Sequence, residues 1–286
     1  MTAQRREVKV SVQLRRLARY LARNTNELRV ILALERMVAR LHTSSLLRDH
    51  LVFKGGFTLL KTTDSQRFTR DLDALALKIP RERLIGEIIN ALHIDLDDAF
   101  WFGDFETDAL PDHGDYEGLR VSNAYHIGET PHTGKIHKLS RAHLDIAFGD
   151  ILPGGPSQGL LSSILPTFPP VSWSIYPLEF ILAEKLETLV SRGSLNSRAK
   201  DYYDLNVIFE RIIINSSLAR TVSITFRHRN TALPRSFEAY LMSLDHRILR
   251  QAWRSVELTR SVSFDQCVST LRTHLSQLDR VVAQRR

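Results

Sequence analysis

Apolar residues recur with helical spacing at both ends of the chain and with strand-like patterns in its middle. Near the start, four of them stand at i, i+3, i+4 and i+7, which predicts a first helix: Leu14, Leu17, Ala18 and Leu21. A second helix is expected from about Glu27 to Leu41, after cap residues at 24–26. Beyond Pro177 the pattern is again helical, through about Arg192, over 198–213 and in two further helices toward the C-terminus.

The middle of the chain reads as strands separated by turns and short helices. Apolar runs and alternating patterns predict strands at about 51–53, 71–79, 98–108, 119–127 and 141–148. Short helices are expected at 57–61 and from Pro80 to Leu92, and a polar turn from Asp112 to Gly118. These elements predict an α+β fold, in which helices pack on a mixed sheet and a helical part follows.

Prolines between 153 and 170 mark a long connection and the expected domain boundary. We therefore expect an N-terminal domain at 1–170, with a helical lead-in, and a helical C-terminal domain at 171–286. A length of 286 residues agrees with about two domains.

Composition narrows the class of protein. With 43% apolar residues the chain can bury a substantial core, and its one cysteine, Cys267, cannot form an internal disulfide. No run of about 18 apolar residues is present, and no apolar segment follows the Arg-rich start, so neither a membrane span nor a secretory signal is expected. The predicted location is the cytoplasm.

The net charge of +7 is unevenly distributed along the chain. Residues 1–50 carry a net +7, residues 51–200 a net −5 and residues 201–286 a net +5. Basic flanks suit a nucleic-acid partner, and clustered carboxylates in the middle suit a divalent cation. The alternative is that these residues are the solvated faces of Arg-rich helices.

Asp71 and Asp73 open an otherwise apolar strand. Residues at i and i+2 of a strand point to the same side, so the two carboxylates lie close together and repel unless a cation neutralises them. Hard oxygen ligands without cysteine or histidine favour Mg²⁺ or Mn²⁺. The alternative is a pair of exposed aspartates bonded to Arg67 and Arg70.

Asp145 lies in the middle of another predicted strand, where an unpaired charge is costly. If its strand lies beside that of Asp71 and Asp73, three carboxylates converge, and such a triad can hold two metal ions for phosphoryl transfer. His143, on the same strand face, either orients a carboxylate or is a structural histidine. Upstream, Gly55 and Gly56 either form a phosphate-binding helix start or a simple tight turn.

Five short motifs carry a resemblance to a known family. They are FKGGFTLL at 53–60, RFTRDLD at 67–73, LDI at 144–146, AEKL at 183–186 and RAKDYYDL at 198–205. In this order and spacing they resemble the AbiEii/AbiGii nucleotidyltransferase toxins of type IV toxin–antitoxin, or abortive-infection, systems. The resemblance spans about residues 50–210 and implies a polymerase-β-like nucleotidyltransferase fold.

The resemblance also implies roles for individual residues. Asp71 and Asp73 match the metal-binding pair of the family, and Asp145 matches its third carboxylate. Gly55 and Gly56 match the turn against the nucleotide phosphates, where we also expect Lys54 and Thr58. Lys185 matches a lysine that contacts the triphosphate, and either Asp201 or Asp204 matches an aspartate needed for activity.

Lys185 and Asp201 also have structural interpretations that do not depend on the resemblance. Lys185 borders an apolar helix stripe and can equally be a surface lysine, and Asp201 can stabilise a helix start. Two positions depart from the family pattern. Arg70 replaces an acidic residue, and Phe57 stands where a hydroxyl group could approach phosphate.

The leading hypothesis is a metal-dependent nucleotidyltransferase that uses Mg²⁺ or Mn²⁺ to move a nucleoside monophosphate from an NTP to an acceptor. By resemblance the acceptor is the 3′ end of tRNA, which inhibits translation and growth, and a cognate antitoxin is encoded nearby. One alternative is a kinase or nucleotidyltransferase that modifies a protein partner. Another is a non-catalytic RNA-binding protein with a degenerate triad.

Overall fold

The computed structural model describes residues 3–63, 65–110, 118–256, 258 and 261–284. The chain divides into two compact units, and neither of them is one continuous segment. The first comprises Met1–Thr58, Thr69–Asp150 and Pro156–Ile175, and the second comprises Leu59–Phe68, Ile151–Gly155 and Tyr176–Arg286. The boundary expected at residue 170 lies inside the first unit, which continues to Ile175.

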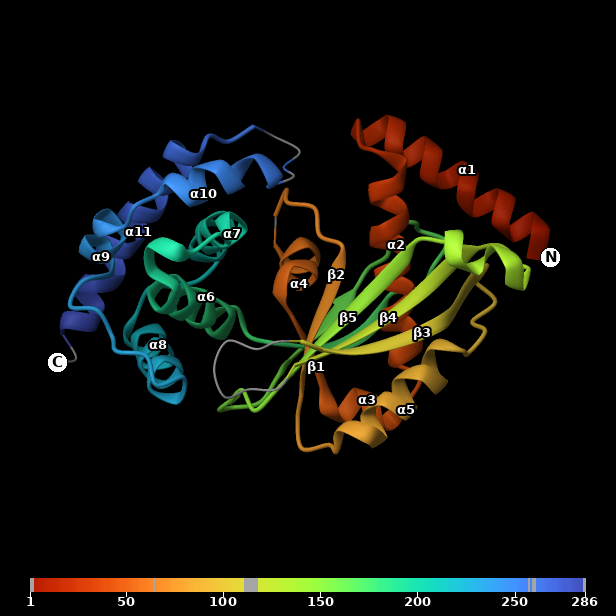
Figure 1. The fold of residues 1–286 in the computed structure, drawn as a ribbon, viewed down its shortest axis with the longest axis horizontal. Helices are drawn as coiled ribbons and strands as arrows, with labels where there is room; N and C mark the ends of the chain where they lie inside the picture. The colour runs from red at the N-terminus through yellow and green to blue at the C-terminus, as the bar shows by residue number, and fades with distance from the viewer. Residues whose placement is uncertain (1–2, 64, 111–117, 257, 259–260, 285–286) are drawn as a thin grey trace. The chain divides into compact units, whose positions relative to one another are not determined.

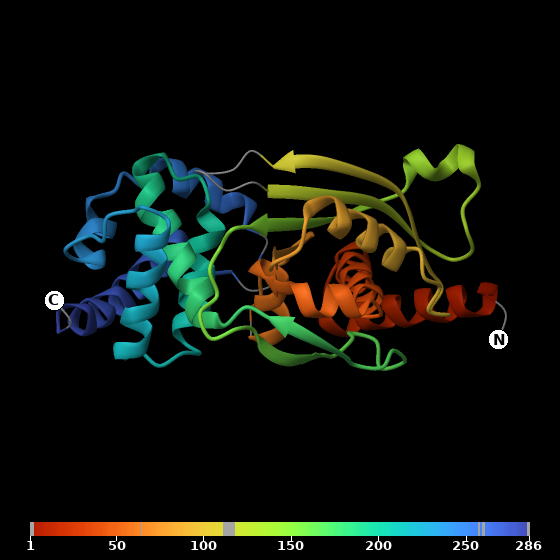
Figure 2. The same ribbon diagram turned by 90° about the horizontal axis from the view of Figure 1, so that it is seen from below.

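A mixed sheet forms the centre of the first unit (Figure 1). Within the described residues it has seven strands in the order β3-β4-β5-β2-β1-β7-β6. Their bounds are β1 Leu51–Lys54, β2 Asp71–Ala76, β3 Phe100–Leu110, β4 Gly118–Ile127, β5 Arg141–Phe148, β6 Ser157–Leu161 and β7 Val171–Ile175. Two pairings are parallel, β2 with β5 and β1 with β7, and the others are antiparallel. The strands β3, β4 and β5 run side by side in Figure 2.

The two faces of this sheet differ in burial because side chains alternate along each strand. On one face, Leu72, Ala74, Leu144 and Ile146 are almost fully buried. On the other face, Asp71, Asp73 and their neighbour Asp145 are only half-buried. The sheet is therefore covered by apolar packing on one side and presents carboxylates on the other.

Helices accompany the sheet in the first unit. They are α1 Ala3–Leu21, α2 Thr25–Leu41, α3 Ser45–His50, α4 Gly55–Thr62, which crosses into the second unit after Thr58, and α5 Arg81–Leu92. The side chain of Asn24 caps α2, and Pro80 precedes α5 in an extended conformation. Since α2 contacts β5, β7 and α5, it is the central helix of this layer.

Buried charges attach α2 to two other segments. The guanidinium groups of Arg36 and Arg40 both bind Asp98, with contacts of 2.6 to 2.8 Å. The carboxylate of Glu35 accepts hydrogen bonds from the Ser163 hydroxyl and the Ile164 backbone N–H. The part of the proline-rich segment from Pro156 onward therefore belongs to the first unit and is fixed to α2 by a buried acid.

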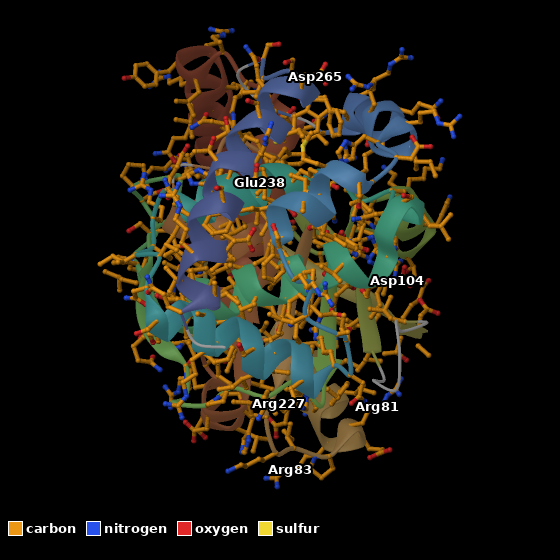
Figure 3. All side chains as sticks on the ribbon, turned by 90° about the vertical axis from the view of Figure 1, so that its left-hand side faces the viewer. Arg81, Arg83, Asp104, Arg227, Glu238 and Asp265 are labelled. Carbon is orange, nitrogen blue, oxygen red and sulfur yellow. The ribbon has the colours of Figure 1, made fainter. Side chains whose placement is uncertain are left out.

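Helices form most of the second unit. They are α6 Leu178–Arg192, α7 Ala199–Phe209, α8 Ser216–His228, α9 Phe237–Ser243, α10 Arg247–Ala252 and α11 Phe264–Ala283. One stripe of α11 is buried, formed by Leu271, Leu275, Leu278 and Val282, and so is Cys267. Ion pairs on its surface join Asp265 to Arg250, both exposed, and the exposed Arg272 to the half-buried Glu238; Glu238 and Asp265 are labelled in Figure 3.

The α+β prediction is confirmed, and so are the helices and strands at the positions given by the strongest patterns. The sequence did not predict α3, β6 or β7, and the helix expected over 198–213 ends at Phe209. Four helices rather than two follow it within the described ranges. Of the predicted polar turn, residues 112–117 lie outside the described part. No helix in the described ranges combines the length and apolar character needed to cross a bilayer.

Candidate active site

The first unit brings the three predicted carboxylates to one face of its sheet. Asp71 and Asp73 alternate along β2, and the parallel register places Asp145 of β5 directly beside Asp73. Partners in register point to the same face. The strands β2 and β5 are therefore neighbours in the sheet, as the predicted convergence of the three carboxylates requires.

Gly55 lies against Asp73 and has a backbone φ of +71°, in the left-handed region that favours glycine. A Cβ at this position would collide with Oδ2 of Asp73 and lie 2.8 Å from its Cβ. The absence of a side chain at Gly55 is therefore what lets the Asp73 carboxylate approach the start of α4.

Other residues of the glycine motif have identified contacts. The Lys54 ammonium, in register with Asp73, binds Asp150 at 2.9 Å. The Thr58 hydroxyl is buried and donates to the Lys54 carbonyl oxygen at 3.0 Å. Phe57 is fully buried with its ring edge-on to Trp173, so this departure from the family pattern fills the core rather than a position at the phosphates.

Arg120 of β4 binds the third carboxylate. Its Nε donates to Oδ1 of Asp145 at 2.7 Å, and its Nη2 donates to Oδ2 at 2.6 Å. This bidentate geometry is the strong form of an arginine–carboxylate pair. The hydrogen bonds to Asp145 raise the pKa of Arg120, and the charges of Asp71 and Asp73 raise it further.

A divalent cation fits part of this arrangement. Asp71 and Asp73 supply hard oxygen ligands on one strand face, the type that Mg²⁺ and Mn²⁺ prefer. Within the described residues, however, no three carboxylate, histidine or cysteine groups are gathered closely enough to hold a metal ion as they stand. Since both oxygens of Asp145 accept hydrogen bonds from Arg120, Asp145 fits a cation only after release from this arginine.

His143 stands in register with Asp71. Its Nδ1 lies 2.8 Å from the Ser122 hydroxyl, on the neighbouring strand β4. The contact found for this ring is therefore a hydroxyl group, which agrees with the structural alternative.

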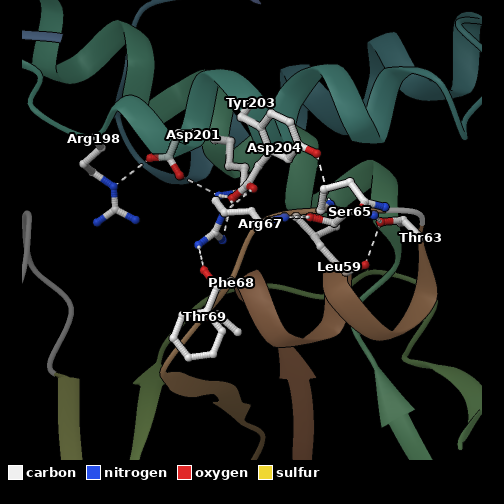
Figure 4. Close-up of polar contacts among 12 residues, drawn as sticks. Leu59, Thr63, Ser65, Arg67, Phe68, Thr69, Arg198, Asp201, Tyr203 and Asp204 are labelled. Carbon is white, nitrogen blue, oxygen red and sulfur yellow. Dashed lines mark hydrogen bonds and ion pairs between the residues drawn. The ribbon is translucent and has the colours of Figure 1, made fainter. Parts of the chain in front are cut away.

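The second unit gathers the other predicted residues into a buried ionic cluster, shown in part in Figure 4. The Lys185 ammonium of α6 binds Asp201 at 2.6 Å and Asp204 at 2.9 Å, both on α7. Arg67 donates to both oxygens of Asp204, at 2.8 and 3.1 Å. Arg198 donates to the remaining oxygen of Asp201 at 2.7 Å. Arg67, which the alternative had paired with the strand aspartates, is thus a partner of Asp204.

Charge compensation fixes the ionisation of this cluster. Burial opposes ionisation of Asp201 and Asp204, but nearby cations outweigh it: Lys185 and Arg198 for the first, Lys185 and Arg67 for the second. Both carboxyls therefore have a lowered pKa. Burial likewise lowers the pKa of Lys185, but the two carboxylates outweigh burial and raise it. Only 12% of the Lys185 side chain is exposed, so it is not a surface lysine.

Comparison with known families gives a match over most of the sequence. The family described as the nucleotidyl transferase AbiEii toxin of type IV toxin–antitoxin systems matches residues 36–268. The chain belongs to the AbiEii toxin family. The resemblance suggested by the sequence motifs is therefore confirmed, and this AbiEii protein is a nucleotidyltransferase toxin whose family implies an antitoxin partner.

Solved structures show the same fold. The nucleotidyltransferase toxin MenT4 from Mycobacterium tuberculosis is 24% identical, with a TM-score of 0.55 over 93% of this chain and 89% of MenT4. JHP933 from Helicobacter pylori is 15% identical, with a TM-score of 0.53 over 89% of this chain and 94% of that one. The comparison with curated proteins gives no match.

Two arginines of this AbiEii toxin have roles that local sequence did not indicate. Arg120 and Arg67 each bind a predicted aspartate through two hydrogen bonds. Arg67 belongs to a recognised motif, but its partner lies 137 positions away. The signal for Arg120 is the pairing of β4 with β5, because it stands directly opposite Asp145 in that register.

Proposed function

We propose that this toxin transfers a nucleoside monophosphate from an NTP to the 3′ end of an RNA, with Asp71 and Asp73 holding a divalent cation. The observation that carries the proposal is the carboxylate pair at the start of β2, with Gly55 leaving room for Asp73 beside the start of α4. Membership of the AbiEii family supports the same class of chemistry.

In the proposed reaction, a hydroxyl oxygen of the acceptor forms a bond to the α-phosphorus of the NTP. The bond from that phosphorus to the bridging oxygen breaks, pyrophosphate leaves with the electron pair, and the hydroxyl proton passes to water. When bound, the cation supplies charge stabilisation for the attacking and departing oxygens. Asp71 and Asp73 orient it, and the backbone N–H groups of Gly55 and Gly56 face phosphate at the beginning of α4.

Lys185, Asp201 and Asp204 have a positioning role in this proposal. An ammonium group has three N–H donors, and two of them bind the carboxylates of Asp201 and Asp204. By the family resemblance, Lys185 is the residue of this group that we expect to be needed for use of the nucleotide. Asp204, which also holds Arg67, is the aspartate that we expect to be needed for activity, whereas Asp201 shares its charge between Lys185 and Arg198.

An RNA acceptor is supported by the outer face of α1. Five exposed basic side chains lie on this helix: Arg5, Lys9, Arg15, Arg16 and Arg19. Tyr20, on the same helix, is 85% exposed and offers a ring on which a base can stack. The one acidic residue of α1, Glu7, is half-buried and close to Gly128. A basic face with an exposed aromatic ring is complementary to a phosphate backbone, and we propose tRNA as its ligand.

The test is incubation of the protein with each of the four α-labelled NTPs, Mg²⁺ and total tRNA. Label is expected on tRNA with the wild type and is expected to be absent with Asp73→Ala, while circular dichroism shows that the variant keeps its fold. Glu129→Ala, at an exposed loop position, is the matched removal of a carboxylate and is expected to stay active. Absence of transfer with all four NTPs, or a fully active Asp73→Ala protein, contradicts the proposal.

The same assay separates the alternatives. Label from γ-labelled but not from α-labelled NTP on a protein indicates a kinase. Tight tRNA binding that weakens steeply with salt, without transfer, indicates a non-catalytic RNA-binding protein. We place the reaction in the cytoplasm, where NTPs and tRNA meet, with the cognate antitoxin as the partner that restrains it.

A further inference from the structure

The Arg120–Asp145 pair occupies the position where a third metal ligand is expected. Both oxygens of Asp145 accept hydrogen bonds from one guanidinium, and Asp145 stands in register with Asp73. The charges of Asp71 and Asp73 also act on Arg120. The pair is open to solutes, since 32% of the Arg120 side chain and 18% of the Asp145 side chain are exposed. Exchange of partners therefore does not require opening of the core.

We propose that Arg120 and a divalent cation exchange places on Asp145. When a cation binds Asp71 and Asp73, Asp145 leaves Arg120 and becomes the third ligand of the cation. The released guanidinium of Arg120 then binds the triphosphate. This inference rests on the proposed nucleotidyl transfer and assigns a role to Arg120, a residue outside the recognised motifs.

Electrostatics gives the exchange its direction. A cluster of three carboxylates is repulsive, and Arg120 supplies one positive charge to it in the absence of metal. A divalent cation supplies two charges to the same oxygens and so makes the guanidinium unnecessary. Arginine remains charged under all working conditions, so the released side chain requires another anion. A triphosphate offers one, with oxygens that match the planar guanidinium fork.

The exchange predicts that removal of the Arg120 side chain has opposite effects on the affinity for metal alone and on the affinity for the metal–nucleotide complex. Without nucleotide, Arg120 competes with the cation for Asp145, and its removal strengthens metal binding. With nucleotide, Arg120 contacts the phosphates, and its removal weakens binding of the metal–nucleotide complex. A guanidinium that stays on Asp145 throughout leaves nucleotide affinity unchanged.

The first experiment measures Mn²⁺ binding to metal-free protein by electron paramagnetic resonance, without nucleotide. Arg120→Gln is expected to bind Mn²⁺ about tenfold more tightly, the scale of one charge-assisted hydrogen-bonded pair. The gain is expected to vanish in Arg120→Gln/Asp145→Asn when compared with Asp145→Asn. A gain that persists in the Asp145→Asn background is a long-range charge effect and overturns the exchange.

Arg141→Gln is the matched control. Arg141 lies on the same face of β5 as Asp145 but binds Asp104 and Glu106, so its loss removes the same charge without freeing the third carboxylate. Its effect on Mn²⁺ affinity is expected to be much smaller. Arg120→Lys, which keeps the charge and loses the bidentate geometry, is expected to fall between Arg120→Gln and the wild type. Circular dichroism checks that each variant is folded.

The second experiment measures binding of Mn²⁺ with a non-hydrolysable NTP analogue, in the absence of RNA. Arg120→Gln is expected to bind the complex about tenfold more weakly than the wild type, opposite in sign to its effect on Mn²⁺ alone. Equal or stronger binding overturns the proposal. If Mn²⁺ binding by the wild type does not depend on Asp73, the proposed function fails as well. If it depends on Asp73 but not on Arg120, only this inference fails.

Discussion

Arg67 and Asp204 are 137 positions apart in the chain and are joined by two hydrogen bonds, Nε to Oδ1 at 2.8 Å and Nη2 to Oδ2 at 3.1 Å. The second unit therefore includes the segment 59–68, although in the sequence this segment stands between β1 and β2 of the sheet. The Gln66 backbone N–H, which donates to the Tyr203 hydroxyl at 3.0 Å, adds a further link to α7.

Removal of this carboxylate is expected to destabilise the second unit strongly. Asp204→Ala leaves the cations of Arg67 and Lys185 buried without one of their partners, and such a loss costs about 3–5 kcal/mol. Urea unfolding followed by circular dichroism measures the change. Asp245→Ala, which breaks an exposed pair with Arg247, is the control and is expected to leave stability unchanged. Equal effects of the two substitutions would contradict the role given to the buried cluster.

Acid is expected to weaken the same cluster. The pKa values of Asp201 and Asp204 are lowered in the folded chain, because the attraction of nearby cations exceeds the effect of burial. Their stabilising contribution is therefore present above the unfolded-state pKa of about 4 and is lost as the pH falls below it toward the folded-state values. The free energy of unfolding, measured from pH 7 to pH 2, is expected to fall more gently in Asp201→Asn than in the wild type. Glu210→Gln, which removes an exposed carboxylate at the end of α7, is expected to keep the wild-type slope.

Gly55 is expected to tolerate no side chain. Gly55→Ala places a Cβ against the Asp73 carboxylate at a positive φ, where alanine itself is strained by about 1–2 kcal/mol. Transferase activity is expected to be lost through displacement of Asp73. Gly86→Ala is the matched control, since nothing lies within 4 Å of its Cβ position and alanine favours the helix by about 1 kcal/mol. An active Gly55→Ala enzyme would show that Asp73 need not stay where it is.

Cys267 is expected to report on opening of the second unit. Burial raises the pKa of its thiol to about 12, although a hydrogen bond from Asn206 acts in the opposite direction. Because the thiolate is the reactive form, a thiol reagent at pH 8 should not label the folded chain. In urea the same single cysteine should react at once. Stoichiometric labelling of the folded protein within the mixing time would exclude this arrangement.

The sequence predicts elements well where the pattern depends on near neighbours. The alternation in β5 correctly places Leu144 and Ile146 on the buried face and Asp145 on the other. β7 carries a similar alternation, with Val171, Trp173 and Ile175 separated by serines, but prolines on both sides favoured a loop. Its strand pairs with β6 and, at Ile175, with the distant strand β1, and these partners are not apparent from local sequence.

The candidate site, too, could be predicted only where the residues are near neighbours in the sequence. Asp71 and Asp73 could be placed together because strand geometry alone brings them to one face. The partners of Asp145 and Asp204 could not be identified in this way. Which arginine binds each of them depends on the pairing of β4 with β5 and on the return of the segment 59–68 to α7.

Because each unit is built from separate segments of the chain, the order of synthesis determines when the ionic cluster can form. A polypeptide leaves the ribosome from its N-terminus, so Arg67 is made well before Asp204, the acid that neutralises it. Until α7 has emerged, the nascent toxin cannot form the ionic cluster of Lys185, Asp201 and Asp204. A chain interrupted after the sheet is complete, at Ile175, therefore contains Arg67 but lacks Lys185, Asp201 and Asp204. Premature termination anywhere before α7 yields a product in which this cluster cannot assemble.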